Sequence, residues 1–193
     1  MPTPQARPTL GLLLLTGGKG ERMGAPKYAL PFPGGGSWAG HLVSVFEAAF
    51  PDAELRILGN PVQERPELPV IEDPRQGPAI ALQTWARTET LERDWWWIAA
   101  CDQMRWDAET LARWFQVAAL GPEWTLGRHQ GRFQPMGSWL PGSLVPTLAR
   151  QDCRSVFALV EALPHRLVDV EGPEWLDLDT PEERRAWESA RHP

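Results

Sequence analysis

The chain has 193 residues, of which 42% are apolar and 23% are charged, and it contains no low-complexity run. This length and composition predict one globular domain and argue against a disordered or fibrous protein. A formal net charge of −6 and only two cysteines argue against broad nucleic-acid binding, a disulfide scaffold and a sulfur-ligated zinc site.

The N-terminus is rich in proline, and residues 1–8 are predicted to be a flexible segment ahead of one domain over residues 9–193. An apolar run over residues 10–15 follows and ends at glycines. It is far shorter than the roughly 20 residues of a membrane helix, so we expect a cytoplasmic protein without membrane contact. The run instead predicts a strand over residues 10–16, buried on both faces of a parallel sheet.

Strand and helix patterns alternate along the rest of the chain. An apolar strand over residues 95–101 carries Asp102 just beyond its carboxyl end, where open α/β sheets bind ligands. The 11 tryptophans are interpreted mainly as core residues and surface anchors rather than as a device for stacking on a nucleotide. Other strands are predicted over residues 55–58, 68–71, 124–127 and 132–139. Helices are predicted over residues 37–50, 107–120, 141–150 and 155–163. Two further helices are predicted to begin at residue 77 and at residue 180, the second running toward residue 191. The pattern predicts a single-domain, three-layer α/β sandwich with a mostly parallel, Rossmann-like central sheet.

A glycine-rich loop follows the first strand, with the sequence Gly17-Gly18-Lys19-Gly20-Glu21-Arg22-Met23-Gly24, and Lys27 comes three residues later. Glycines let backbone amides approach phosphate oxygens, and Arg22 and Lys27 add positive charge where a strand gives way to a loop. The spacing matches neither a Walker loop nor a dinucleotide fingerprint. The loop is either a cradle for a triphosphate or a glycine-rich surface turn with incidental basic residues, and the added Arg-Met-Gly and lysine favour the cradle.

The sequence resembles the molybdenum cofactor guanylyltransferases, within the wider superfamily of nucleotidyltransferases with a glycine-rich signature. Their first loop, Gly-Gly-x-x-x-Arg-Met-Gly followed by a lysine, is matched by Gly17, Gly18, Arg22, Met23, Gly24 and Lys27. Later landmarks of the family are similar to Asp73 with Gly77-Pro78, Cys101-Asp102, Gln134-Pro135, Arg154-Ser155-Val156 and Asp179-Thr180-Pro181-Glu182. The resemblance covers about residues 10 to 190 in the family's order.

This resemblance implies a nucleotidyltransferase fold and magnesium-dependent transfer of GMP from GTP to the terminal phosphate of molybdenum-molybdopterin. Catalysis would depend on Lys27, Arg22 and Asp102. The implied nucleotide site comprises Leu15, Gly17, Gly18, Lys27, Asn60, Asp73 and Asp102. Its partners would be GTP and molybdopterin-type small molecules, with transient contacts to cofactor-synthesis or client enzymes.

The predicted metal ligands are Asp102 and Asp179, because Mg²⁺ needs only one or two carboxylates besides phosphate oxygens and waters. Asp179 is otherwise part of the turn before the last helix, and Asp102 could simply bond within its loop. Asp73 is a nucleotide-pocket residue or a cap of the following helix. The sequence therefore leaves a structural alternative open for each aspartate.

The chain also departs from the family pattern. Thr16 replaces the usual alanine, and Asp177 with Asp179 replaces an asparagine pair, as in related enzymes that use CTP. Gly17-Gly18 favours GTP instead. The alternatives are a cytidylyltransferase acting on the same pterin, an enzyme for another small phosphate such as a sugar phosphate, and a non-catalytic nucleotide-binding carrier.

Overall fold

The structure is a computed structural model that describes residues 7–18, 20, 23–90 and 92–191. Its strands are β1 (Leu10–Leu15), β2 (Glu54–Leu58), β3 (Val70–Ile71), β4 (Trp95–Ala100), β5 (Trp124–His129), β6 (Arg132–Pro141) and β7 (His165–Asp169). Its α-helices are α1 (Trp38–Ala49), α2 (Pro78–Thr88), α3 (Ala108–Ala118), α4 (Val145–Ala149), α5 (Val156–Glu161) and α6 (Pro181–Arg191). Short 3-10 helices are η2 (Lys27–Ala29), η3 (Gly142–Leu144) and η4 (Pro173–Trp175).

The described residues form one seven-stranded sheet in the order β3-β2-β1-β4-β6-β5-β7. Strands β3, β2, β1 and β4 are parallel, β6 is antiparallel to both of its neighbours, and β7 is parallel to β5. The predicted mostly parallel sheet is confirmed. The sequence analysis does not predict β7, because this edge strand is exposed at both ends and only partly buried between them, so no apolar run marks it.

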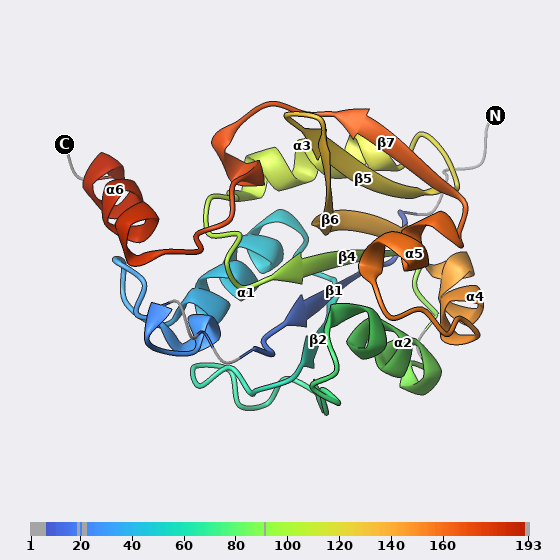
Figure 1. Ribbon diagram of the computed structural model, residues 1–193, viewed down its shortest axis with the longest axis horizontal. Coiled ribbons are helices and arrows are strands. Elements are labelled where there is room, and N and C mark those ends of the chain that lie inside the picture. Colours follow the sequence, from blue (N-terminus) through green and yellow to red (C-terminus); the bar gives the residue numbers. More distant parts are fainter. Residues whose placement is uncertain (1–6, 19, 21–22, 91, 192–193) are drawn as a thin grey trace.

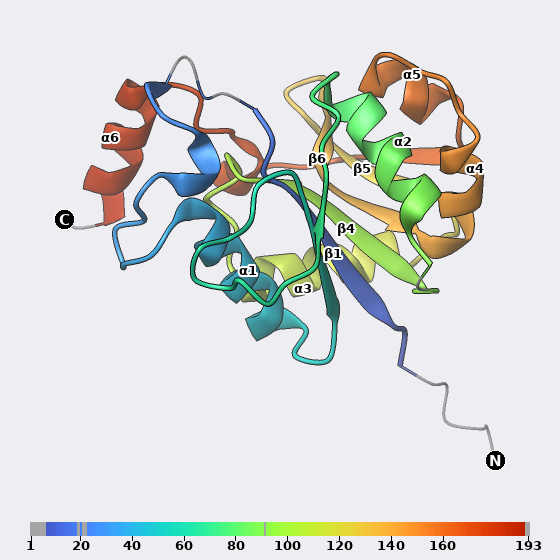
Figure 2. The ribbon, with the colours of Figure 1, turned by 90° about the horizontal axis from the view of Figure 1, so that it is seen from below.

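Helices cover both faces of the sheet (Figure 1 and Figure 2). Leu42 of α1 and Leu111 of α3 belong to the hydrophobic cluster on one face. Leu82 of α2 and Leu159 of α5 belong to a second cluster on the other face, where α4 also packs against α2. This arrangement confirms the predicted three-layer α/β sandwich.

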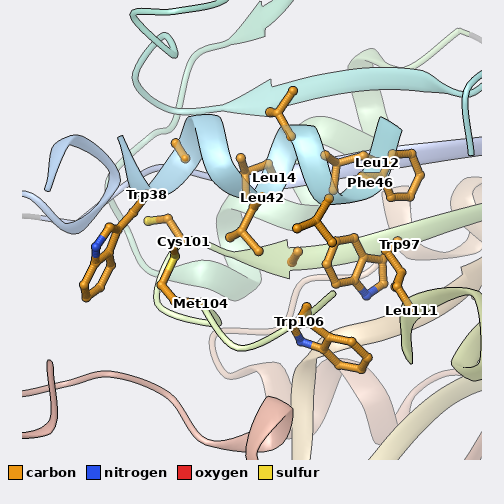
Figure 3. Packing of buried hydrophobic residues seen from close by; sticks show 14 of the residues in the cluster. Leu12, Leu14, Trp38, Leu42, Phe46, Trp97, Cys101, Met104, Trp106 and Leu111 are labelled. Carbon is orange, nitrogen blue, oxygen red and sulfur yellow. The ribbon is translucent and has the colours of Figure 1, made fainter. Parts of the chain in front are cut away.

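Most of the tryptophans lie in these two clusters, as predicted. Ten of the 11 are buried, and Trp95 is partly exposed. In the cluster of Figure 3, the ring of Trp97 stacks on Phe46, with the ring centroids 5.8 Å apart and an interplanar angle of 3°. On the other face, the ring of Trp96 fills the space that a side chain at Gly11 would need, because a Cβ there would lie 2.4 Å from Trp96 Cε3. The aromatic core thus explains a glycine inside β1.

Several helices begin at the residues that the sequence indicates. Ser37 accepts a hydrogen bond from the Gly40 amide ahead of α1, and Asp107 accepts one from Thr110 ahead of α3. Thr180 and Glu183 exchange hydrogen bonds at the start of α6, which is the capping box expected there. Cys101 lies in the turn after β4 rather than in the strand.

Among the described residues, the first with a long-range side-chain bond is Thr9, whose amide and hydroxyl donate to Asp94 Oδ2 at 2.7 and 2.9 Å. Residues 1–6 lie outside the described residues, so the domain boundary after residue 8 stays a prediction. Within the described ranges, no helix has the length and apolar character needed to span a membrane.

Candidate active site

The candidate site lies at the carboxyl edge of the sheet, where β1 and β4 end side by side. Leu15, the last residue of β1, pairs with Ala100, the last residue of β4. The loop that begins at Thr16 therefore starts next to the turn that carries Asp102 (Figure 1). This is the edge at which open α/β sheets bind ligands.

The glycine-rich loop has a backbone that other residues would adopt with strain. Gly18, Gly20 and Gly24 have φ values of 94°, 62° and 71°. A Cβ at Gly20 would also lie 2.0 Å from the Ala25 carbonyl oxygen. These glycines keep the loop tight and its amides close to an approaching ligand. Lys19, Glu21 and Arg22 lie outside the described residues, so the catalytic role predicted for Arg22 stays a prediction.

Thr16 and Asn60 tie the start of this loop to the end of β2. Thr16 is fully buried, and its hydroxyl donates to the Asn60 carbonyl at 2.7 Å and accepts from the Asn60 amide at 2.8 Å. The Asn60 side-chain amide donates to the Thr16 carbonyl at 2.9 Å. Asn60 thus lies beside the loop and its NH₂ group donates to the backbone there, so its predicted nucleotide contact stays a prediction. Thr16, which departs from the family pattern, supplies the hydroxyl that takes part in two of these three hydrogen bonds.

Asp73 lies directly against Gly17. A Cβ at Gly17 would be 2.0 Å from Asp73 Oδ2, so a larger residue would displace this carboxylate. The other oxygen, Oδ1, accepts a hydrogen bond from the Arg75 amide at 2.8 Å, where Arg75 has a φ of 58°. Asp73 therefore shapes the turn after β3 and also borders the glycine-rich loop. Asp73 does not cap the following helix, because the N-cap of α2 is Gly77 and no side chain caps it. The nucleotide-pocket role of Asp73 stays a prediction.

We predict that Gly17→Ala raises the dissociation constant of the nucleotide by about tenfold, or ~1.4 kcal/mol. The new Cβ must push the Asp73 carboxylate aside, but this carboxylate is the end of a flexible side chain, so the fold should survive. Titration calorimetry with the preferred triphosphate measures the change. Gly121→Ala is the matched control, because its Cβ would meet the Glu123 carboxylate at 2.3 Å in the loop between α3 and β5. Equal weakening in both variants would contradict a specific role for Gly17.

Lys27 places its ammonium between two carboxylates from distant parts of the chain. Nζ lies 2.9 Å from Asp102 Oδ2 and 2.6 Å from Asp179 Oδ1. Burial alone would lower the pKa of Lys27, but the charges of the two aspartates and its hydrogen bonds to them raise this pKa above the ordinary value. The side chain is therefore a charged ammonium that links the turn after β4 to the segment before α6.

The segment before α6 is fixed next to Asp102 by backbone and side-chain bonds. Leu178 is fully buried, and its amide donates to the Asp102 carbonyl at 3.0 Å. Glu183 accepts from the Asp179 amide at 2.8 Å. Asp177, on the other side of Leu178, adds a third carboxylate. Displacement of water by surrounding protein raises the pKa of Asp177 to about 7, and the negative charges of Asp102 and Asp179 contribute to this rise.

The two predicted metal ligands fit a magnesium ion that is shared with a triphosphate. Among the described residues, no group of three or more His, Cys, Asp or Glu side chains is arranged to hold a metal ion. Asp102 and Asp179 nevertheless converge on a single cation, the ammonium of Lys27. Because Mg²⁺ takes one or two carboxylates and completes its shell with phosphate oxygens and waters, two aspartates suffice here.

The structure thus brings Lys27, Asp102 and Asp179 together at one point and Gly17 and Asp73 at another. The sequence analysis does not include Asp177 in the site. The signal that could have found it is the spacing of Asp177 and Asp179, because side chains two residues apart in an extended segment lie on the same side.

Comparisons with known proteins agree with this architecture. Residues 12–167 match the family model of the MobA-like NTP transferase domain. A molybdenum cofactor guanylyltransferase from Pseudomonas putida is 26% identical over 162 residues, which cover 83% of this chain and 85% of the relative. The matched family segment begins within β1 and ends within β7, so it overlaps every strand of the described sheet.

Solved structures share the fold at lower identity. The Rv0371c protein of Mycobacterium tuberculosis has a TM-score of 0.70 and 22% identity, covering 93% of this chain and 97% of that one. The same protein in a complex with manganese has a TM-score of 0.64. Molybdopterin-guanine dinucleotide biosynthesis protein A from Archaeoglobus fulgidus has a TM-score of 0.68 and 19% identity, covering 94% of this chain and 98% of that one. The chain therefore shares its fold with these solved structures.

Proposed function

Since the chain belongs to the MobA-like NTP transferase family, it is a nucleotidyltransferase, and we propose that it makes a guanine dinucleotide cofactor. In the proposed reaction, GMP passes from GTP to the terminal phosphate of molybdenum-molybdopterin in the presence of Mg²⁺. The observation that carries this proposal is the meeting of Lys27, Asp102 and Asp179 beside the glycine-rich loop. One cation and two carboxylates at a point suit a site that handles a triphosphate and a hard metal ion.

The preference for guanine rests on two observations. Gly17-Gly18 is the pair that goes with guanine in the family, and the relative from Pseudomonas putida is named a guanylyltransferase. Asp177 and Asp179 favour a second candidate, a cytidylyltransferase acting on the same pterin, because these aspartates are similar to those of enzymes that use CTP. An enzyme for another small phosphate would have the same phosphate site with a different acceptor.

In the proposed mechanism, an oxygen of the acceptor phosphate forms a bond to the α-phosphorus of GTP. The bond from the α-phosphorus to the oxygen that leads to the β-phosphate breaks, and pyrophosphate leaves with that electron pair. No covalent enzyme intermediate is needed. The chain contributes alignment of the two substrates and stabilisation of the charge that develops on the leaving group.

Each site residue has a role in this proposal. Loop amides at Gly17 and Gly18 bind phosphate oxygens, Lys27 stabilises charge on the departing pyrophosphate, and Arg22 contacts the outer phosphates. Asp102 and Asp179 would hold Mg²⁺, which neutralises phosphate charge when it is bound. Leu15, Asn60 and Asp73 border the nucleoside. The Rv0371c structure with manganese is consistent with a divalent cation on this fold.

We predict that GTP raises the midpoint of thermal unfolding more than CTP, ATP or UTP when Mg²⁺ is present. A ligand at a hundredfold excess over its dissociation constant stabilises the native state by about 2.7 kcal/mol. The same four nucleotides are then tested for pyrophosphate release with molybdenum-molybdopterin. Asp102→Asn serves as the inactive control for release.

Each outcome assigns a function. A larger shift and faster release with CTP would replace the guanylyltransferase by the cytidylyltransferase. Release with a sugar phosphate but not with the pterin would replace the acceptor. Nucleotide binding without release from any acceptor would favour the non-catalytic carrier.

A further inference from the structure

The ammonium of Lys27 occupies the point at which the two candidate metal ligands converge. Nζ is within 2.9 Å of Asp102 Oδ2 and within 2.6 Å of Asp179 Oδ1. Mg²⁺ binds carboxylate oxygens at about 2.0–2.1 Å, so an ion held by both of these oxygens would take the space of Nζ. The lysine and the metal ion therefore cannot use this point at the same time.

We propose that the Lys27 ammonium occupies the position of the metal ion in the free enzyme and moves to the phosphates when metal and nucleotide bind together. This inference rests on the proposed function, because it assigns a second role to a residue of the same site. Lys27 acts first as a counter-ion to the aspartates and then as a counter-ion to the phosphates. Its four-carbon stem allows this change without movement of the backbone.

The charges around the site explain why a counter-ion is needed. Asp102, Asp177 and Asp179 lie close enough to influence one another, and the whole chain carries a net charge of −6. Lys27 forms salt bridges with both Asp102 and Asp179 and so offsets part of the repulsion between these carboxylates in the free enzyme.

Binding order follows from this arrangement. In the free enzyme a divalent cation must displace Lys27, and this exchange is opposed because the ammonium loses its ion pairs with Asp102 and Asp179. A bound triphosphate supplies a new partner, since its phosphate oxygens accept the displaced ammonium. Metal and nucleotide should therefore bind with positive coupling, and Lys27 should be a principal source of this coupling.

The test measures Mn²⁺ binding without turnover. Free Mn²⁺ is quantified by electron paramagnetic resonance at one fixed pH, with and without a GTP analogue whose α,β-bridge resists cleavage. The proteins are the wild type, Lys27→Met and Arg113→Met. Arg113 pairs with Glu109 on the exposed surface of α3, so this control removes the same charge outside the site. Thermal melts verify that each variant is folded, and Lys27→Gln replaces Lys27→Met if the latter unfolds.

When no nucleotide is present, we expect Lys27→Met to bind Mn²⁺ at least about fivefold more tightly than the wild type. The Mn²⁺ affinity of Arg113→Met should increase clearly less. With the analogue present, Mn²⁺ affinity should rise more in the wild type than in Lys27→Met. Adding Asp179→Asn to Lys27→Met should abolish the gain. Equal or weaker Mn²⁺ binding by Lys27→Met without nucleotide would overturn the inference. Failure of the proposed function would appear separately, as absence of pyrophosphate release.

Discussion

Asp102→Asn is expected to lower the turnover number of nucleotidyl transfer by about a hundredfold or more. The substitution removes the negative charge that faces Lys27 and the proposed metal ion, but it keeps the size of the side chain. The fold should survive, because the structural contact of Asp102 is through its carbonyl oxygen, which accepts from the Leu178 amide at 3.0 Å. Steady-state pyrophosphate release at saturating nucleotide and metal measures the loss.

Asp107→Asn is the matched control for this experiment. Asp107 lies on the same loop, but its carboxylate caps α3 by accepting a hydrogen bond from the Thr110 amide at 2.8 Å. Asparagine is an equally good N-cap, so this variant removes the same charge and keeps the helix start. Turnover of Asp107→Asn should stay close to that of the wild type. If Asp102→Asn also turned over at that rate, Asp102 would not be a metal ligand.

The centre of the fold could be predicted because its strands are uniformly apolar. The runs that form β1 and β4 are buried on both faces, so they contain no polar residue that would obscure their length. Parallel pairing then places their carboxyl ends at the same edge, which brings the glycine-rich loop next to Asp102. The elements that frame the site thus follow from local pattern and from the geometry of parallel sheets.

The contacts within the site could not be predicted in the same way, because they join segments that are far apart in the sequence. Nothing in the local pattern around Asp179 shows that Leu178 is buried against the turn after β4. The hydrogen bonds between Thr16 and Asn60 likewise depend on the pairing of β1 with β2. The sequence predicts which residues carry chemistry, but the pairing of Lys27 with both aspartates comes from tertiary packing.

Trp97→Ala is expected to lower the free energy of unfolding by about 3–5 kcal/mol, which is the usual cost of removing a large aromatic side chain from a core. Trp97 is fully buried in the middle of β4, and its ring stacks on Phe46 and meets Trp106 edge to face (Figure 3). Small domains have a total stability of only about 5–15 kcal/mol, so this variant should be near the limit of folding. Chemical denaturation with urea measures the change.

Trp97→Phe separates the contribution of the ring from that of the indole N–H. Among the described residues, Trp97 Nε1 is buried without a hydrogen-bond partner, so phenylalanine keeps an aromatic ring against Phe46 and breaks no hydrogen bond. Trp124→Phe is the comparison, because Trp124 Nε1 donates to Ser138 Oγ at 2.9 Å. Loss of this hydrogen bond should add about 1 kcal/mol to the cost of the substitution in free energy of unfolding. Trp97→Phe should therefore cost less than Trp124→Phe and far less than Trp97→Ala. If Trp97→Phe were as costly as Trp97→Ala, the stability would depend on the full volume of the indole rather than on one aromatic ring against Phe46.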